Sequence, residues 1–193
     1  MKLSYLIVAG CAVLSLGSCA KKDGGADSAM KMKADSMKAA YTAISAAWDA
    51  GKTDEFGKYI ADNVVDHDPM PGAKPGLAGM KEMAGMMKTW YPDMKSTIED
   101  MRVEGDVISV RFKSAGTNSG AMMGMPATNK KMSDVEGIEM MRWENGKFVE
   151  HWGVFDVMKM MQQLGMMPAP GAHPEGDMSK PMDEKGGADK KKM

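Results

Sequence analysis

Cysteine and histidine are both scarce in this chain. Its 193 residues include two cysteines, Cys11 and Cys19, and three histidines. The histidines lie far apart in the sequence and there is no Cys-x-x-Cys pair, so no zinc-type ligand spacing is present. There is also no basic excess, because 25 lysines and arginines stand against 26 acidic residues. The sequence therefore predicts neither a zinc-type metal site nor a nucleic-acid partner.

Leucine is rare as well, and methionine is abundant. Only two leucines follow residue 19, whereas the chain has 25 methionines. Met80 and Met87 fall where a helix needs apolar contacts, and methionine fills irregular cores well. We interpret most methionines as replacements for leucine in packing. Thioethers also bind copper(I), so the methionines of stretches 122–125 and 158–161 support an alternative hypothesis of a soft-metal site.

The apolar run nearest the N-terminus is short. It extends from Leu3 to Leu16 after the positive charge of Lys2, and it is too short to span a bilayer as a mature helix. This pattern predicts a targeting segment. The sequence Leu16-Gly17-Ser18-Cys19 resembles a bacterial lipobox, which implies cleavage before Cys19 and attachment of lipid to its thiol. A Cys11–Cys19 disulfide is the alternative.

The chain divides into four parts. Residues 1–18 are predicted to be a lipoprotein signal peptide, and residues 19–29, small or charged after the lipidated Cys19, a flexible tether. Residues 30–167 carry the periodic patterns of one folded domain. In residues 168–193 Pro, Gly, Lys and Asp dominate without periodicity, which predicts a disordered tail. We expect the protein in the bacterial cell envelope, periplasmic or surface-facing, held to a membrane by its lipid.

The folded part combines helices with antiparallel strands. Apolar residues from Met30 to Trp48 recur every three or four positions, which predicts an amphipathic helix that ends at Gly51. Further helices are predicted at 53–59, at 77–87 and after Asp156. Strands are predicted at 63–68, 95–103, 107–118, 132–143 and 147–156. Hairpins with segregated helices indicate an α+β fold, and a curved sheet covered by helices leaves an apolar hollow for a small ligand.

The stretch Gly146 to Asp156 has the highest density of reactive side chains. Strict alternation places Phe148, Glu150, Trp152, Val154 and Asp156 on one face and His151 on the other. A carboxylate beside aromatic rings can act as an acid or base. The alternative role for Asp156 is the N-cap of the following helix.

Four other groups of polar residues are relevant to a site. Asn118 ends the inward face that Phe112 shares. The Asp66-His67-Asp68 sequence is either a metal or proton-transfer cluster or a turn at a strand end. His151 is either a functional residue or a surface or packing residue. Glu136 and Glu139 are interpreted as solvated or paired strand residues.

Several short motifs resemble one known family when they are taken together. They are Asp66-His67-Asp68-Pro69, Gly76-x-x-Gly79, Tyr91-Pro92-Asp93, Gly116-Thr117, Gly124-Met125-Pro126, the stretch from Gly146 to Trp152, Asp156 and Gln162-Gln163-Leu164-Gly165. This set resembles the SnoaL-like polyketide cyclase (ester cyclase) family of the nuclear transport factor 2-like superfamily. The resemblance covers about Tyr41 to Pro168. It implies a cone-shaped α+β barrel made of a strongly curved, mostly antiparallel sheet with packed N-terminal helices.

The resemblance also implies a chemistry. Family cyclases close a ring by intramolecular aldol condensation of a polyketide ester, with a carboxylate as acid and base and with no metal or cofactor. The matching carboxylate is Asp156. The family usually has Gly-Thr-His where this chain has Gly116-Thr117-Asn118, so Asn118 would be a polar positioner that does not titrate near neutrality.

The predicted site therefore contains six residues. Asp156 and Asn118 are assigned to catalysis, and Trp152, Glu150, Phe112 and His67 to substrate binding. The expected partner is a small apolar carbonyl compound, and a homodimer is one option for the oligomeric state. A non-catalytic ligand-binding lipoprotein of the same fold and a structural envelope lipoprotein are the alternative functions.

Overall fold

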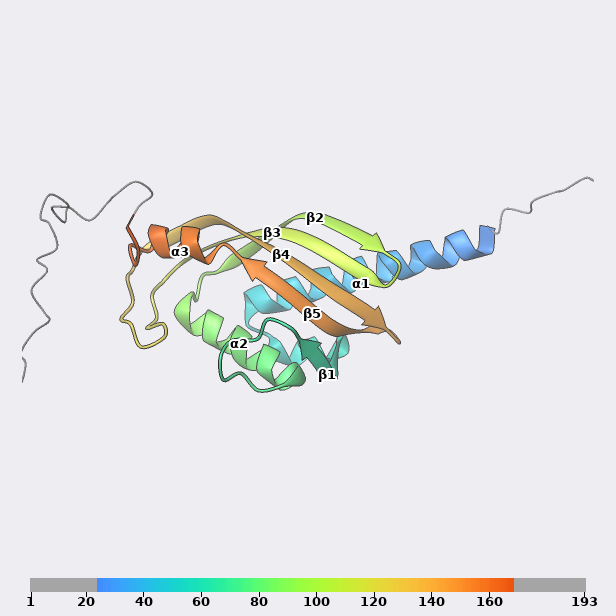
Figure 1. Cartoon of the computed structure of the whole chain (residues 1–193), viewed down its shortest axis with the longest axis horizontal. Helices are drawn as coiled ribbons and strands as arrows, with labels where there is room; N and C mark the ends of the chain where they lie inside the picture. The colour runs from blue at the N-terminus through green and yellow to red at the C-terminus, as the bar shows by residue number, and fades with distance from the viewer. Residues whose placement is uncertain (1–23, 169–193) are drawn as a thin grey trace, which may run out of the picture.

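One curved sheet and three α-helices make up the described part of the protein. The computed structural model describes residues 24–168. The five strands form a single sheet in the order β1-β5-β4-β3-β2 (Figure 1). The elements in chain order are α1 (Gly24–Ala50), the 3-10 helix η1 (Thr53–Lys58), β1 (Ile60–Asp66), α2 (Gly76–Trp90), β2 (Lys95–Glu104), β3 (Val107–Thr117), β4 (Lys131–Glu144), β5 (Lys147–Phe155) and α3 (Val157–Gln163). The predicted α+β class is confirmed.

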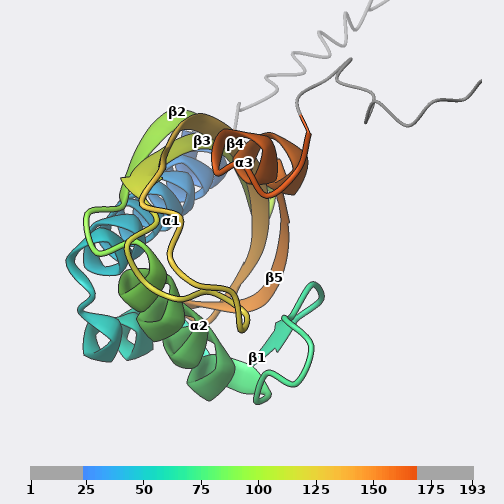
Figure 2. The ribbon, with the colours of Figure 1, turned by 90° about the vertical axis from the view of Figure 1, so that its left-hand side faces the viewer.

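Tight turns make the sheet mostly antiparallel. Strands β2 to β5 pair in sequence, and β1 pairs in parallel with β5. The β4–β5 turn places Asn145 and Gly146 at φ angles of 49° and 85°, as the Asn-Gly signal predicts. The sheet wraps around α1 and α2 (Figure 2). It stays open rather than closing into a barrel, because α1 packs against β2 and α2 against β1, so the helices occupy the gap between the two edges.

Helix α1 begins earlier than the sequence pattern predicts. It starts at Gly24, so residues 24–29, predicted to belong to the flexible tether, are helical. Most side chains from 25 to 36 are exposed, and the first buried one is Met37. This part of α1 projects beyond the sheet (Figure 1). The predicted signal peptide, Cys19 and nearly all of the predicted tail lie outside the described residues. Within residues 24–168, no helix is both long and apolar enough to cross a bilayer.

Two separate hydrophobic cores lie on the concave side of the sheet. The first packs α1, η1 and α2 against the sheet, and the second packs α3 and the 119–130 loop against it. Buried side chains of the first core include Met37, Tyr41, Phe56, Ile60, Ile108, Val110, Met141 and Phe148. Those of the second include Tyr91, Met94, Met122, Met132, Val135, Met160 and Leu164. Methionine thus does the packing that leucine does in most cores.

Candidate functional site

A β-bulge at Val149 decides which side chains of β5 face the concave side of the sheet. Arg142 pairs with Glu150 and Trp143 with Phe148, so Val149 has no partner on β4. An extra residue on one strand moves every later side chain to the opposite face. The face predicted by strict alternation is therefore wrong beyond the bulge. Phe148 is buried in the first core, and His151, Gly153 and Phe155 continue its concave face, while Glu150, Trp152 and Val154 lie on the convex face.

The concave face carries a strip of residues that belongs to neither core. We call this strip the middle band; its members are Phe112, Gly137, Glu139, His151 and Gly153. Their cross-strand pairing places them between Met141 of the first core and Val135 of the second. All except Gly137 are partly exposed although they face inward. Solvent therefore reaches the concave face of the sheet between the two cores, and we call this region the hollow.

Aromatic side chains shape one side of this hollow. The ring of Phe112 lies across Gly137, where a Cβ atom would stand 2.3 Å from the ring. Phe112 also stacks on Phe155, with 6.4 Å between ring centroids and 19° between ring planes. The substrate-binding role predicted for Phe112 stays a prediction, but the structure does place this residue at the hollow.

Asp66 and His151 form a hydrogen-bonded pair at the edge of the middle band. Asp66 Oδ1 and His151 Nδ1 are 2.9 Å apart, with side chains 24% and 15% exposed. A carboxylate only accepts hydrogen bonds, so Nδ1 is the donor. Nε2 lies 3.2 Å from the position that a Cβ atom of residue 153 would occupy. The Asp66 contact thus fixes the imidazole ring and leaves Nε2 beside Gly153.

The backbone around this pair is fixed by a second carboxylate. Asp68 Oδ2 accepts a hydrogen bond from Gly153 N at 3.0 Å, and Asp68 N donates to Asp66 Oδ1 at 3.2 Å. The predicted Asp66-His67-Asp68 cluster is therefore divided between the two sides of the sheet. Its two carboxylates contact β5 at His151 and Gly153, whereas His67 lies elsewhere.

Tyr41 and Glu139 form a second pair across the hollow from α1 to β4. The Tyr41 hydroxyl donates to Glu139 Oε2 at 2.7 Å. Burial, followed by the charge of Glu139 and this hydrogen bond, raises the pKa of Tyr41 far above its usual range, so the phenol remains a donor. Glu139 Cγ lies 3.6 Å from the same Cβ position of residue 153. Gly153 therefore lies next to both the imidazole of His151 and the side chain of Glu139.

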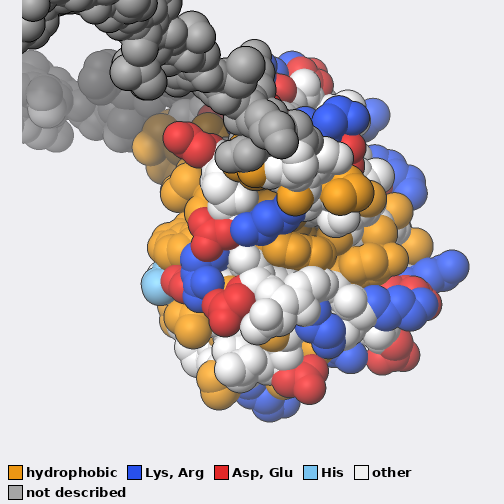
Figure 3. All heavy atoms as spheres, turned by 90° about the vertical axis from the view of Figure 1, so that its right-hand side faces the viewer, with side chains coloured by type: hydrophobic (Ala, Val, Ile, Leu, Met, Phe, Trp, Pro, Cys, Tyr) orange, Lys and Arg blue, Asp and Glu red, His pale blue; other side chains and the backbone are white. Residues whose placement is uncertain are grey.

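Three of the predicted substrate-binding residues meet on the convex face instead. The His67 ring stacks on Trp152 with centroids 4.4 Å apart, and His67 Nε2 donates to Glu150 Oε2 at 3.0 Å. Glu150 Oε1 accepts from Arg142 Nε at 2.6 Å. These bonds, from His67 first and then Arg142, lower the pKa of Glu150. The bulge is the reason that this group points away from the hollow. At the end of the molecule that forms the right-hand side of Figure 1, acidic and basic side chains lie close together (Figure 3).

Asp156 and Asn118 hold backbone segments in place. Asp156 is exposed, and its Oδ1 accepts from Lys159 N at 2.9 Å as the N-cap of α3. Asn118 is fully buried, and its Oδ1 accepts from Thr128 N at 2.9 Å while its Nδ2 donates to Gly120 O at 2.9 Å. Asn118 thereby ties the two ends of the 119–130 loop together. The catalytic roles assigned to both residues stay predictions.

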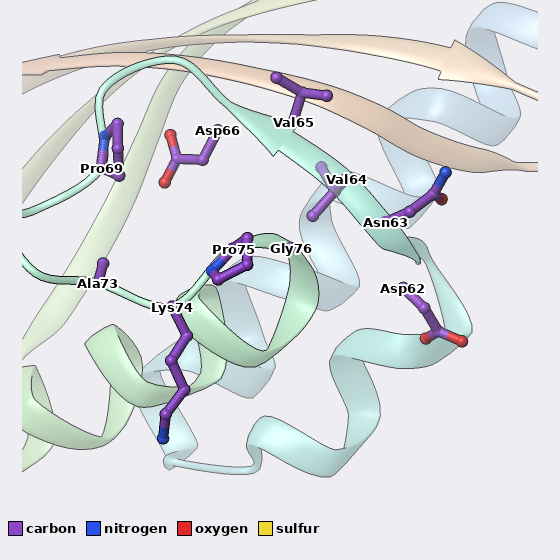
Figure 4. Close-up of a pocket in the computed structure, with 10 residues that line it drawn as sticks. All are labelled: Asp62, Asn63, Val64, Val65, Asp66, Pro69, Ala73, Lys74, Pro75 and Gly76. Atoms are coloured by element: carbon purple, nitrogen blue, oxygen red, sulfur yellow. The ribbon is translucent and has the colours of Figure 1, made fainter.

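A groove adjoins the Asp66 side of the site. It has a volume of about 580 Å³ and runs between β1 and the segment that leads into α2 (Figure 4). Val64, Asp66, Pro69 and Pro75 are among its lining residues. Binding sites for small molecules commonly have volumes of about 300–1,000 Å³. Asp66 thus belongs both to the pair with His151 and to a groove of the size that suits a small molecule.

The sequence did not predict that four polar residues lie close together: Asp66, His151, Tyr41 and Glu139. Glu139 was interpreted as a solvated or paired strand residue, and no role was assigned to Tyr41. Strict alternation correctly places His151 and Trp152 on opposite faces of β5. It wrongly predicts that Trp152, rather than His151, shares the inward face of Phe148. No group of three or more His, Cys, Asp or Glu in the described range 24–168 is arranged to hold a metal ion.

The chain matches a known family over most of its folded part. The sequence model of the SnoaL-like polyketide cyclase family matches residues 38–164. The chain belongs to the SnoaL-like polyketide cyclase family. The match begins inside α1 and ends just after α3, so it includes the whole middle band. A search of curated proteins found no match to this SnoaL-like protein.

Solved structures show the same fold. TsrD from Streptomyces laurentii superposes with a TM-score of 0.64 at 25% identity, covering 69% of this chain and 97% of that chain. A proposed polyketide cyclase from Bacillus cereus ATCC 10987 gives 0.60 at 29% identity, covering 68% and 82%. IdmH, a proposed polyketide cyclase from Streptomyces antibioticus, gives 0.60 at 27% identity, covering 67% and 98%. The predicted nuclear transport factor 2-like, SnoaL-like fold is thus confirmed.

Proposed function

We propose that this SnoaL-like protein is an exported lipoprotein whose domain is a cyclase or isomerase acting by proton transfer on a small, largely apolar carbonyl compound. The observation that supports this function best is the Asp66–His151 pair, which presents Nε2 in a hollow lined by aromatic side chains. The side chains of the chain itself would act as acid and base. The family membership supports the same class of reaction.

The pair has the geometry that general acid–base catalysis requires. An imidazole held through Nδ1 by a carboxylate keeps one orientation, and the carboxylate stabilises the imidazolium form. Nε2–H of that form can give a proton to a carbonyl oxygen while a base accepts the proton of the neighbouring C–H bond. The resulting enol can attack a second carbonyl and close a ring, or take up its proton at another carbon.

This proposal gives Asp156 and His151 different roles. The resemblance matched the catalytic carboxylate to Asp156, which caps α3 from an exposed position. His151 faces the hollow, and its ring is fixed by a partly buried hydrogen bond to Asp66. We therefore propose His151 for acid–base chemistry and Asp156 for stability of the junction between β5 and α3.

A carbon acid of the expected kind can test the function directly. Indanone is a small apolar ketone, and its α-hydrogens exchange slowly with D₂O. We expect the purified domain, residues 24–193, to accelerate α-deuteration of indanone, measured by proton NMR against a buffer control. Saturable binding of indanone with exchange at the buffer rate would instead support the non-catalytic ligand-binding alternative. Exchange at the buffer rate without binding would remove the proposal for this class of ketone.

Lipid attachment at Cys19 is tested separately in cells. The full chain, expressed in a bacterium that is fed a labelled fatty acid, should incorporate the label into this protein. Cys19→Ala should abolish incorporation, because the thiol that accepts the lipid is lost. Cys11→Ala is the matched control and should be labelled like the wild type. Equal labelling of the Cys19→Ala protein would contradict the proposed anchor.

A further inference from the structure

We propose that Glu139 is a second catalytic residue, acting as the base opposite His151, and that Tyr41 is its positioning residue. This inference rests on the proposed proton-transfer function. It assigns a task to a carboxylate that the sequence pattern treated as an ordinary strand residue. Both proton-transfer groups would then reach a substrate that lies beside Gly153.

Glu139 faces the concave side of the sheet beside Gly153. Glu139 pairs with Gly153 across the β4–β5 ladder, on the concave face and in the middle band. Its two neighbours Ile138 and Met140 are exposed on the convex face. Position 153 has no side chain, and both Glu139 Cγ and His151 Nε2 lie within 3.6 Å of the place where its Cβ would stand. The missing side chain thus leaves a small space next to both Glu139 and His151.

Glu139 has a hydrogen-bond partner but no cationic partner among the described residues. Its Oε2 accepts a hydrogen bond from Tyr41, and among residues 24–168 no lysine, arginine or histidine forms an ion pair with it. The glutamates on the convex face behave differently, since Glu99 and Glu136 both pair with Arg111. A carboxylate in a partly desolvated place is costly unless it is paired. An inward-facing carboxylate without a cation therefore favours a chemical role over a structural one.

Tyr41 supplies the positioning. It comes from α1, is buried in the first core, and reaches β4 with its hydroxyl. A phenol that donates to a carboxylate oxygen fixes the orientation of that carboxylate. The bond also occupies Oε2 and leaves Oε1 for the substrate. Tyr41 thus holds the base without touching the reacting atoms.

The proton-transfer step balances with these groups alone. Oε1 of Glu139 takes a proton from the carbon next to a carbonyl, and the electron pair of that C–H bond becomes the C=C bond of the enol. The π electrons of the carbonyl move to oxygen, which takes the proton from Nε2 of the protonated His151. Return of the two protons, to the same or a different carbon, restores both side chains. Two groups that transfer protons in the same step avoid a free enolate.

The indanone exchange assay tests the inference with three variants of the domain. Glu139→Gln should lower kcat at least 100-fold and leave the Kd of indanone within a factor of about three, because the amide keeps an acceptor for Tyr41 but cannot take a proton. Tyr41→Phe should lower kcat about tenfold and leave the Kd of indanone within a factor of about three, since the carboxylate loses the donor that fixes its orientation. Glu136→Gln, on the convex face of the same strand, is the matched control and should keep the wild-type rate.

Thermal unfolding of each variant checks that the fold is retained, and Glu139→Asp provides a second measurement. Partial activity in Glu139→Asp with none in Glu139→Gln would support a base at this position. A wild-type rate in Glu139→Gln, with His151→Gln inactive, would overturn the role of Glu139 and leave the proposed function intact. Exchange at the buffer rate in the wild-type domain would overturn both. A wild-type kcat in Tyr41→Phe would remove Tyr41 as the positioning residue.

Discussion

Replacing His151 with glutamine should lower the rate of indanone α-deuteration by a factor of about 100 to 10,000, the range that general acid–base groups contribute. Glutamine retains a donor for Asp66 but cannot carry a proton to the carbonyl oxygen. Binding of indanone should change little, because Phe112 and Phe155 still line the hollow. The measurement is kcat and Kd by NMR for wild type and variant at the same pH.

Asp66→Asn separates two roles of Asp66, which are to orient the His151 ring and to stabilise its protonated form. The amide can still meet Nδ1 of His151, but it carries no charge to stabilise the imidazolium, so kcat should fall at least about tenfold while His151 stays in place. The comparison variant is His67→Gln, which alters a histidine on the convex face. We expect its rate to match the wild type. A loss of activity in His67→Gln with full activity in His151→Gln would reverse the assignment of the two faces.

Gly79→Ala should destabilise the domain by about 3 kcal/mol or more, the range of severe steric changes in a packed region. A Cβ atom at this position would stand 1.9 Å from the carbonyl oxygen of Lys74, which belongs to the backbone and has no flexible end to move away. The turn that leads into α2 would have to shift. For a domain of this size, the melting temperature should fall by roughly 10 °C.

The same substitution six positions later should have the opposite sign. Gly85 lies on the exposed side of α2 and would place its Cβ where nothing lies within 4 Å. Alanine is better than glycine in a helix by about 1 kcal/mol, so Gly85→Ala should raise the melting temperature by a few degrees. Calorimetric scans of both variants provide the comparison. Equal stability of the two variants would contradict the close approach at Gly79.

The local elements could be predicted because their causes are local. The Asn-Gly turn sets the β4–β5 hairpin, and apolar residues at helical spacing set α1 from Met37 onward. The beginning of α1 could not be predicted, because residues 24–36 bury almost nothing and small and charged residues suit both a helix and a tether. The open edge of the sheet was also beyond reach, since it depends on how α1 and α2 pack against β2 and β1.

The sequence by itself determined the family, the α+β class and part of the set of polar residues from which a site could be built. The tertiary structure alone decided which of them meet. One unpaired residue, Val149, turns His151 inward and Trp152 outward. No local sequence pattern predicts this bulge, because the strand has the same residues with or without it. The pairings Asp66–His151 and Tyr41–Glu139 join residues 85 and 98 positions apart. Such contacts follow from strand register and helix packing, which only the assembled fold specifies.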